Sequence, residues 1–189
     1  TFLAEYGKGR VGMIVRTVAD VLTGVPSIVI GIIAYQLVVA PMHQFSAFAG
    51  GIALAILMIP TIVRTTEEIL LLVPHEYTEA ALALGAPRWR AVVSIVYPAA
   101  LSGMTTGVML AIARAAGETA PLLFTAFGNT YWNWDVMQPT AALPLQIYQY
   151  AISPYEDWHR QAWAAALVLV GLILILSAIA RWARERKQV

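Results

Sequence analysis

Long uncharged stretches constrain this sequence more than any other feature. Residues 21–40, 45–63 and 161–180 form uncharged runs of 20, 19 and 20 residues, and residues 91–113 form a run of 23. At about 1.5 Å of rise per residue, a helix of about 20 residues crosses the roughly 30 Å hydrocarbon core of a bilayer. Charged residues make up only 12% of the chain, about half their share in soluble domains. The sequence therefore predicts an all-α integral membrane protein.

Four transmembrane helices are expected, separated by segments of different composition. Residues 1–20 mix charged and apolar residues, which predicts an interfacial helix with a solvated, mostly basic face. Residues 64–97 are expected to form a loop of helices between two spans. Residues 119–160 contain Pro139, Pro144 and Pro154, so a structured external loop with room for one short helix is expected there. The predicted spans cover residues 21–40, 45–63, 98–118 and 161–180.

Two local details follow from this division of the chain. Pro98 is expected to mark the point where the loop helix ends and the third span begins, because proline interrupts a helix. Arg64 and Glu68 lie four residues apart on a predicted helical extension of the second span and are expected to pair weakly.

Basic residues indicate how the chain is oriented. Short cytoplasmic segments of membrane proteins carry an excess of lysine and arginine. The four predicted spans place ten of the twelve basic residues on one side, together with the 64–97 loop, whereas Arg160 lies on the other side and Arg114 near its membrane edge. Both ends of the chain are therefore expected in the cytoplasm. The ten residues are Lys8, Arg10, Arg16, Arg64, Arg88, Arg90, Arg181, Arg184, Arg186 and Lys187.

Several functions are disfavoured by what the sequence lacks. It contains no cysteine and no Gly-x-x-x-x-Gly-Lys-Ser/Thr motif, so it offers no thiolate site and no nucleotide-binding loop. Acidic residues near His75 are expected to be solvated rather than to bind a metal, and Arg88 and Arg90 are too few for a nucleic-acid surface. The chain starts at Thr1 without a signal-peptide pattern, which suggests the later part of a longer protein.

The 64–97 segment has the pattern of a helix, a sharp turn and a second helix. Pro74 and Pro87 suit helix starts, and Gly85 suits a left-handed helix end. Small side chains keep the first helix thin, so that another protein could approach closely. The segment is thus either a docking element or an ordinary amphipathic surface loop. The small residues are Ala80, Ala81 and Ala83.

The spacing of this segment resembles a known signature. Glu79-Ala80-Ala81, three residues, Gly85, nine residues and then Ile95-x-x-Pro98 is similar to the "EAA" motif of the membrane subunits of bacterial ABC importers, except that Tyr97 stands where leucine is commonest. The resemblance implies a six-helix type I importer permease with a cytoplasmic coupling loop that docks on an ATPase subunit. It implies coupling roles for Glu79, Ala80, Ala81, Gly85 and Arg88.

An arginine and a glutamate near the outer end of the third span are unusual. Arg114 and Glu118 lie four residues apart and so share one helix face, above a stripe formed by Gly103, Gly107 and Ala111. They form either an internal salt bridge that neutralises two charges, or an anion pathway in which Arg114 meets the solute and Glu118 limits its affinity.

A second resemblance covers nearly the whole chain. Residues 24–31 and 114–126, with the tail from Leu143 to Ala166, are similar to the A-type permease of phosphate-specific ABC importers. The resemblance implies a subunit of an inner-membrane importer of inorganic phosphate, with the anion pathway at Arg114, Glu118 and Thr119. It implies ATPase subunits that bind ATP and magnesium, a C-type second permease, an external phosphate-binding protein and two earlier spans.

Other functions stay open on the residues alone. The coupling signature is indifferent to cargo, so an importer of sulfate, molybdate or another small solute is the nearest alternative. An intramembrane enzyme would need apposed catalytic groups that the spans lack, and this chain is expected to bind no cofactor or metal itself. A structural scaffold would tolerate alanine at both Glu79 and Arg114.

Overall fold

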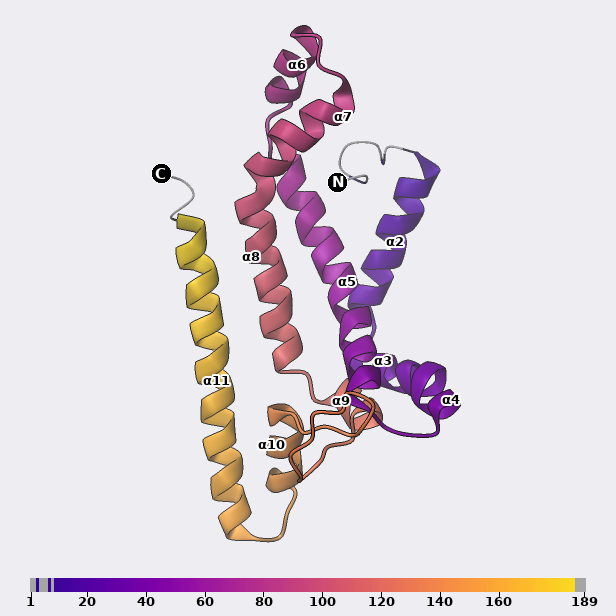
Figure 1. The fold of residues 1–189 in the computed structure, drawn as a ribbon, viewed down its shortest axis with the longest axis vertical. Coiled ribbons are helices and arrows are strands. Elements are labelled where there is room, and N and C mark those ends of the chain that lie inside the picture. Colours follow the sequence, from indigo (N-terminus) through magenta and orange to yellow (C-terminus); the bar gives the residue numbers. More distant parts are fainter. Residues whose placement is uncertain (1–2, 4–6, 8, 186–189) are drawn as a thin grey trace. The chain divides into compact units, whose positions relative to one another are not determined.

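The structure, a computed structural model, describes residues 3, 7 and 9–185, and it describes side chains up to residue 182. Within these residues the chain is helical, and the β pairing present there is one isolated bridge between Phe127 and Thr140 (Figure 1). The all-α prediction is therefore confirmed. Three of the basic residues predicted on the cytoplasmic side, Lys8, Arg186 and Lys187, lie outside the described residues.

The chain divides into two compact units. Unit 1 comprises residues Thr1–Thr23, Pro60–Ala111 and Ser177–Val189, and unit 2 comprises Gly24–Ile59 and Ile112–Leu176. Three long helices pass from one unit to the other. They are α5 (Ala47–Leu71), α8 (Tyr97–Ala116) and α11 (Glu156–Glu185).

Three helical stretches are long and apolar enough to cross a membrane, namely Ala47–Leu71, Arg88–Ala116 and Glu156–Trp182. A fourth span exists only if α2 (Arg10–Gly24) and the helix from Ser27 to Met42 count as one, although they are bent by 104°. The second helix comprises α3 (Ser27–Ala34), the π-helical η1 (Tyr35–Val39) and α4 (Ala40–Met42).

The straight helix predicted over residues 21–40 is not observed. Pro26 has φ −57° and ψ 136° and precedes α3, so it begins a new helix instead of continuing α2. Proline lacks an N–H group and disfavours the helical conformation of the residue before it, here Val25. The length of the uncharged run predicts one continuous helix, whereas the Gly24-Val25-Pro26 sequence indicates the break.

Pro98 does not start a new helix as predicted. The helix that begins at Arg88 continues through α7 (Arg88–Ala91), the π-helical η2 (Val92–Val96) and α8. A proline ring clashes with the carbonyl four residues earlier, which is Ser94. The wider π-helical turn lies at that carbonyl, and such turns adjust the backbone without ending the helix.

The 119–160 segment contains two short helices where room for one was predicted. They are α9 (Ala120–Thr125) and α10 (Leu143–Ala151). Between them the backbone is irregular, and its carbonyls at Val136 and Gln138 accept hydrogen bonds from Phe48 N and Ala47 N at the start of α5. The loop therefore satisfies donors that a helix start leaves free.

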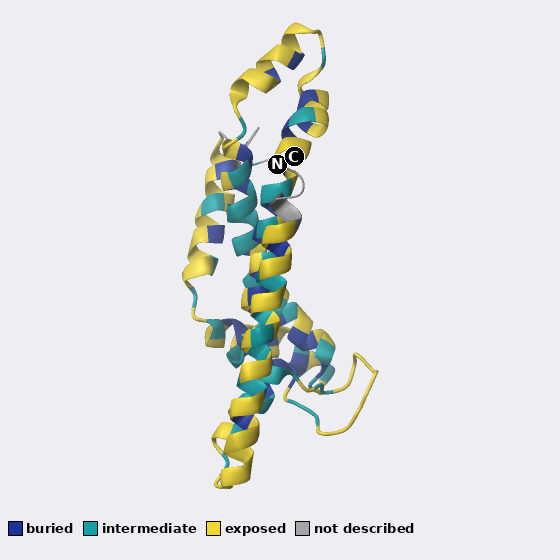
Figure 2. Cartoon of the chain, turned by 90° about the vertical axis from the view of Figure 1, so that its left-hand side faces the viewer, coloured by how far each residue is buried: buried dark blue, intermediate teal, exposed yellow. Residues whose placement is uncertain are grey.

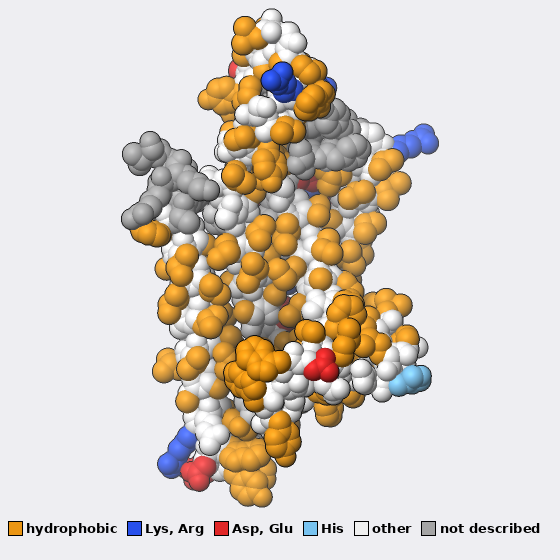
Figure 3. All heavy atoms as spheres, in the orientation of Figure 1, with side chains coloured by type: hydrophobic (Ala, Val, Ile, Leu, Met, Phe, Trp, Pro, Cys, Tyr) orange, Lys and Arg blue, Asp and Glu red, His pale blue; other side chains and the backbone are white. Residues whose placement is uncertain are grey.

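Each unit has a small apolar core of its own. In unit 1, Leu70 packs with Val96, Ala100 and Met104. In unit 2, Leu122, Ala126 and Leu145 form the core. Most other helix surfaces are exposed or intermediate (Figure 2), and hydrophobic side chains dominate the visible surface (Figure 3). Apolar surface of this extent is typical of helices that face lipid or partner subunits.

Candidate functional site: the coupling loop and the Arg114 end of α8

The predicted helix, turn and helix are observed in unit 1. Helix α6 runs from His75 to Ala83 after Pro74, and α7 begins at Arg88 after Pro87 (Figure 1). Proline has no backbone N–H donor, and the first residues of a helix have no intrahelical acceptor for that donor, so proline is tolerated at these positions. We call the segment from Pro74 to Ala91 the coupling loop.

Gly85 makes the sharp turn of this loop. Its φ is +83°, in the left-handed region where side chains with a Cβ atom are strained. Ala86 N donates to Ala81 O at 3.1 Å, and Gly85 N donates to Leu82 O at 2.9 Å. These two bonds form a Schellman motif, which satisfies carbonyls at the end of α6. The prediction of a left-handed helix end at Gly85 is confirmed.

The two faces of α6 differ in exposure. Thr78 and Ala81 are buried, whereas Glu79 and Ala80 are exposed. Leu84, at the tip beside Gly85, is 89% exposed, which leaves a large apolar side chain in a position to enter a partner surface. Sequence reasoning missed Leu84, although a leucine directly before a turn glycine was the available signal.

This pattern separates the five predicted coupling residues by position. Glu79 and Ala80 lie on the outer face of α6, and Arg88 is an exposed residue at the start of α7. Ala81 faces inward and accepts the hydrogen bond from Ala86 N. Ala81 and Gly85 therefore shape the loop, whereas the other three lie where a partner could touch them.

Arg114 and Glu118 lie in unit 2 and face one another, as their spacing predicts. Arg114 Nε is 3.8 Å from Glu118 Oε1, and the two side chains are 58% and 18% exposed. Arg114 belongs to the last turn of α8, whose dipole favours a cation. Glu118 and Thr119 lie past the helix end, and Thr119 precedes α9. The contact is an ion pair that is longer than a hydrogen bond.

The two stretches that carried the second resemblance pack together in unit 2. A Cβ atom added to Gly31 of α3 would lie 2.8 Å from Pro121 Cα and 3.2 Å from Ala120 O of α9. The absence of a side chain at Gly31 is thus what allows α3 to approach α9. This contact holds the segment that directly follows Arg114, Glu118 and Thr119.

In unit 1, the small stripe of α8 packs against α5. A Cβ atom on Gly103 would lie 2.8 Å from Ile69 Cγ2, and one on Gly107 would lie 2.9 Å from Thr65 Oγ1. Thr65 Oγ1 donates to Thr61 O at 2.9 Å. The stripe therefore serves close helix packing, as small residues do in membrane helices.

An open groove of about 480 Å³ in unit 1 runs between α5 and α8 near Tyr77 of α6. Its polar lining includes Thr65, Glu68, Ser102 and Thr106. Thr106 Oγ1 donates to Ser102 O at 3.0 Å, a bond to the preceding helical turn that hydroxyl side chains commonly make. Within the described residues, no group of three His, Cys, Asp or Glu residues could hold a metal ion.

One charged cluster was not foreseen. Arg64 was predicted to pair with Glu68 but contacts Asp20 instead, with Arg64 Nε 2.8 Å from Asp20 Oδ1. Arg16 was assigned to a solvated face but bonds to the buried Glu67. Local spacing does not indicate these contacts, because Arg16 and Glu67 lie 51 residues apart.

The chain is similar in sequence to several known proteins. The chain is 48% identical over its full length to the phosphate transport system permease protein PstA of Xylella fastidiosa (strain 9a5c), and it covers 67% of that protein. It is 48% identical over its full length to PstA of Haemophilus influenzae, again covering 67% of the relative. PstA 1 of Mycobacterium tuberculosis (strain H37Rv) is 42% identical over 99% of this chain and 62% of its own length. The chain thus spans about two thirds of the length of these relatives.

A solved structure shares the fold. It is described as "Inward facing conformations of the MetNI methionine ABC transporter", and it superposes with a TM-score of 0.70 at 20% identity, covering 94% of this chain and 74% of that one. The family model for "Binding-protein-dependent transport system inner membrane component" matches residues 1–189. The chain belongs to this family of inner-membrane transport components.

Proposed function

We propose that this chain is a membrane-spanning permease subunit of an ATP-driven importer of inorganic phosphate. The observation that carries the proposal is the 48% identity to the PstA proteins over the whole chain. The likeness to the methionine transporter, at 20% identity, supports the fold alone. Sulfate or molybdate import would use the same coupling loop, but the relatives named above are all phosphate permeases.

The partners of this permease follow from its place in such an importer. ATPase subunits dock on the coupling loop, and they bind the ATP and magnesium that this chain does not bind. A second, C-type permease completes the pathway, and a phosphate-binding protein delivers the solute from outside. The coupling loop and both ends of the chain lie in the cytoplasm, as the distribution of basic residues predicts.

Docking uses the exposed side of the coupling loop. Glu79 and Ala80 lie on the outer face of α6, and Leu84 projects from its tip. The small side chain of Ala80 allows close approach, while Leu84 supplies apolar surface to bury. Movement of α6 is transmitted to α5 and α8, because residues 72–74 join α6 to α5 and α7 continues as one helix into α8. Rocking of these helices alternates access to the pathway.

Arg114 is the residue that meets phosphate in this proposal. A guanidinium offers a planar set of donors that matches phosphate oxygens. Glu118 lies 3.8 Å away, too far for a hydrogen bond, so it orients Arg114 without occupying its donors. The nearby negative charge also limits the affinity, which allows the anion to leave. Thr119 adds a hydroxyl next to this pair.

Phosphate uptake by cells that carry Arg114→Ala or Arg114→Lys tests the proposal. Loss of a charged hydrogen-bonding partner costs about 1.5–3 kcal/mol, or about 10- to 100-fold in uptake at low phosphate. Phosphate uptake by the Arg114→Lys variant is expected to lie between that of Arg114→Ala and that of the wild type. Arg160→Ala is a matched control, because Arg160 is 75% exposed and pairs only at the surface. Normal uptake by an assembled Arg114→Ala complex would exclude the pathway role. Stronger competition by sulfate or molybdate than by phosphate would exclude phosphate as the cargo.

A further inference from the structure

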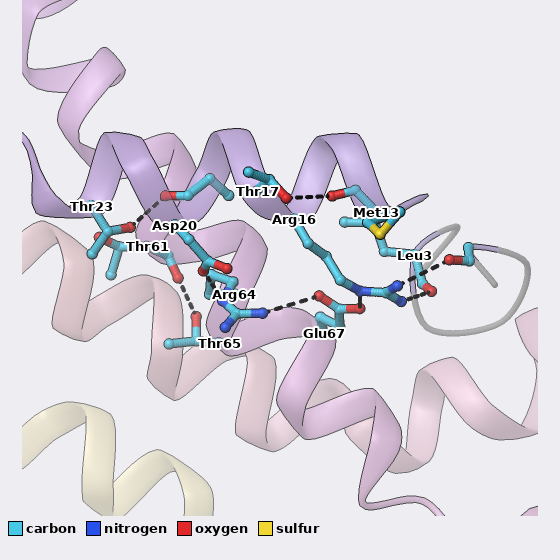
Figure 4. A network of polar contacts seen from close by, with 12 residues as sticks. Leu3, Met13, Arg16, Thr17, Asp20, Thr23, Thr61, Arg64, Thr65 and Glu67 are labelled. Carbon is cyan, nitrogen blue, oxygen red and sulfur yellow. Dashed lines mark hydrogen bonds and ion pairs between the residues drawn. The ribbon is translucent and has the colours of Figure 1, made fainter. Parts of the chain in front are cut away.

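Four alternating charges join α2 to α5 in unit 1 (Figure 4). Arg16 and Asp20 come from α2, whereas Arg64 and Glu67 come from α5. Arg16 Nε donates to Glu67 Oε1 at 2.6 Å, and Arg64 Nε lies 2.8 Å from Asp20 Oδ1. We call these four residues the α2–α5 charge cluster. Its net formal charge is zero, and each pair bridges the two helices.

The Arg16–Glu67 pair is the buried part of the cluster. The Glu67 side chain is 5% exposed and that of Arg16 is 33% exposed. Arg16 also donates to Gly7 O at 3.0 Å and to Leu3 O at 2.8 Å, which uses further guanidinium donors. A buried carboxylate is strongly destabilising when its partner is removed, because an uncompensated charge remains. The burial of Glu67 therefore depends on α2 staying beside α5.

The Arg64–Asp20 pair is more exposed to solvent, and Arg64 also lies near the carboxylate of Glu67. The side chains of Arg64 and Asp20 are 38% and 52% exposed. Arg64 Nη1 also lies 3.8 Å from Glu67 Oε2, which is a buried oxygen without a hydrogen-bond partner among the described residues. Arg64 thus lies between two carboxylates. It forms an ion pair with the exposed one at 2.8 Å and is about one ångström too far from the buried one for a hydrogen bond.

The position of the cluster connects it to the coupling loop. Glu67 lies four residues before the end of α5 at Leu71, and α6 begins four residues later at His75. Within unit 1, the same end of α5 packs against η2 and α8 through Leu70. A displacement of α6 therefore acts first on the part of α5 to which the cluster attaches α2.

We propose that the α2–α5 charge cluster makes α2 move together with α5 during transport, with Arg16 and Glu67 as positioning residues. Arg64 contacts Asp20 of α2 and also lies 3.8 Å from Glu67 Oε2, so both carboxylates have a cationic neighbour while the two helices move together. This inference rests on the proposed function, because the coupling loop supplies the displacement. It assigns a role in transmission to residues outside both the coupling loop and the Arg114–Glu118 pair.

Charge exchange across the buried pair tests the proposal in the assembled transporter. Arg16→Glu and Glu67→Arg are each expected to lower the ratio of phosphate uptake to ATP hydrolysis by about tenfold. The exchanged double variant is expected to recover most of the ratio, because the opposite charges face one another again. Arg160→Gln breaks the exposed Arg160–Glu156 pair, whose atoms lie 3.6 Å apart, and serves as the control without effect. Unchanged ratios in both single variants, or no recovery in the double variant, would overturn the proposal.

The milder change Glu67→Gln, combined with a distance measurement, covers the case in which the charge reversals prevent assembly. The chain contains no cysteine, so spin labels can be attached at Val18→Cys and Leu71→Cys, which are exposed positions on α2 and α5. The distance between the labels is expected to stay constant between nucleotide-free and ATP-trapped complexes and to change in the Glu67→Gln variant. Equal changes with and without Glu67→Gln would refute joint movement. The distance measurement does not depend on phosphate uptake. If phosphate is not the cargo, uptake is absent but the label distance still responds to Glu67→Gln; if the cluster has no transmission role, the distance does not respond.

Discussion

The turn at Gly85 allows a quantitative test of how the coupling loop is built. Its φ is +83°, and a Cβ atom added to this residue would meet no other atom within 4 Å, so substitution by alanine causes no steric clash. The penalty is therefore that of the backbone alone, about 1–2 kcal/mol for a residue with a Cβ atom in the left-handed region. Asparagine tolerates this region better than alanine does and is the matched milder change.

The expected result is a weaker interaction with the ATPase. If docking requires the observed turn, a penalty of about 1–2 kcal/mol lowers the affinity by about 5- to 30-fold. Binding of purified ATPase subunit to the permease in nanodiscs measures this directly for Gly85→Ala and Gly85→Asn. Gly51→Ala is the control, because Gly51 lies inside α5 and a Cβ atom there meets nothing within 4 Å.

Two results would refute this reasoning. Native affinity in the Gly85→Ala variant would mean that the ATPase does not depend on the left-handed turn. An equal loss in Gly51→Ala would mean that the effect comes from general destabilisation rather than from the loop. A graded loss, with alanine weaker than asparagine and Gly51→Ala unchanged, is the pattern that the φ of Gly85 predicts.

Two further glycine substitutions test helix packing. Gly31→Ala places a Cβ atom 2.8 Å from the backbone of Pro121, so it is expected to cost about 1–3 kcal/mol and lower the thermal midpoint of the purified complex, whereas Gly51→Ala does not. Gly107→Ala places a Cβ atom 2.9 Å from Thr65 Oγ1 and 3.1 Å from Thr65 Cβ, and rotation of the Thr65 side chain does not move its Cβ, so the thermal midpoint is expected to fall here too. Gly107→Leu adds a larger side chain and should lower it much further. Equal melting temperatures for Gly107→Ala and Gly107→Leu would contradict the close approach of α5 and α8.

The parts of the fold that local chemistry determines could be predicted from the sequence. The loop turn at Gly85 and the helix starts after Pro74 and Pro87 depend on residues within a few positions. Glycine is needed for a left-handed turn, and proline suits a helix start. The pairing of Arg114 with Glu118 is also local, since the two residues are four positions apart, although Glu118 lies just past the end of α8.

Contacts between distant residues could not be predicted in the same way. Arg16 and Glu67 are separated by 51 residues, and nothing in either neighbourhood indicates the other. Arg64 could pair locally with Glu68 but contacts Asp20 of α2 instead. The tertiary contact overrode the expected pair because exposed pairs four residues apart contribute only about 0.3–0.5 kcal/mol. At Pro26 the signal for a helix break is local, but the length of the uncharged run around it predicts a continuous span.

The low burial of the long helices is the reason why we expect polar contacts to matter for coupling. Only 22% of the span in α5, 28% of that from Arg88 to Ala116 and 6% of that in α11 is buried within the chain. We expect lipid or partner subunits to cover most of their apolar surface, and lipid tails give little apolar driving force for one helix to pack on another. A buried ion pair between α2 and α5 fixes their register with two side chains. Breaking that pair is thus expected to impair the transmission of motion between the helices at a milder perturbation than is needed to prevent membrane insertion. For this reason, phosphate uptake per ATP hydrolysed should reveal the effect of breaking the pair more clearly than the expression level does.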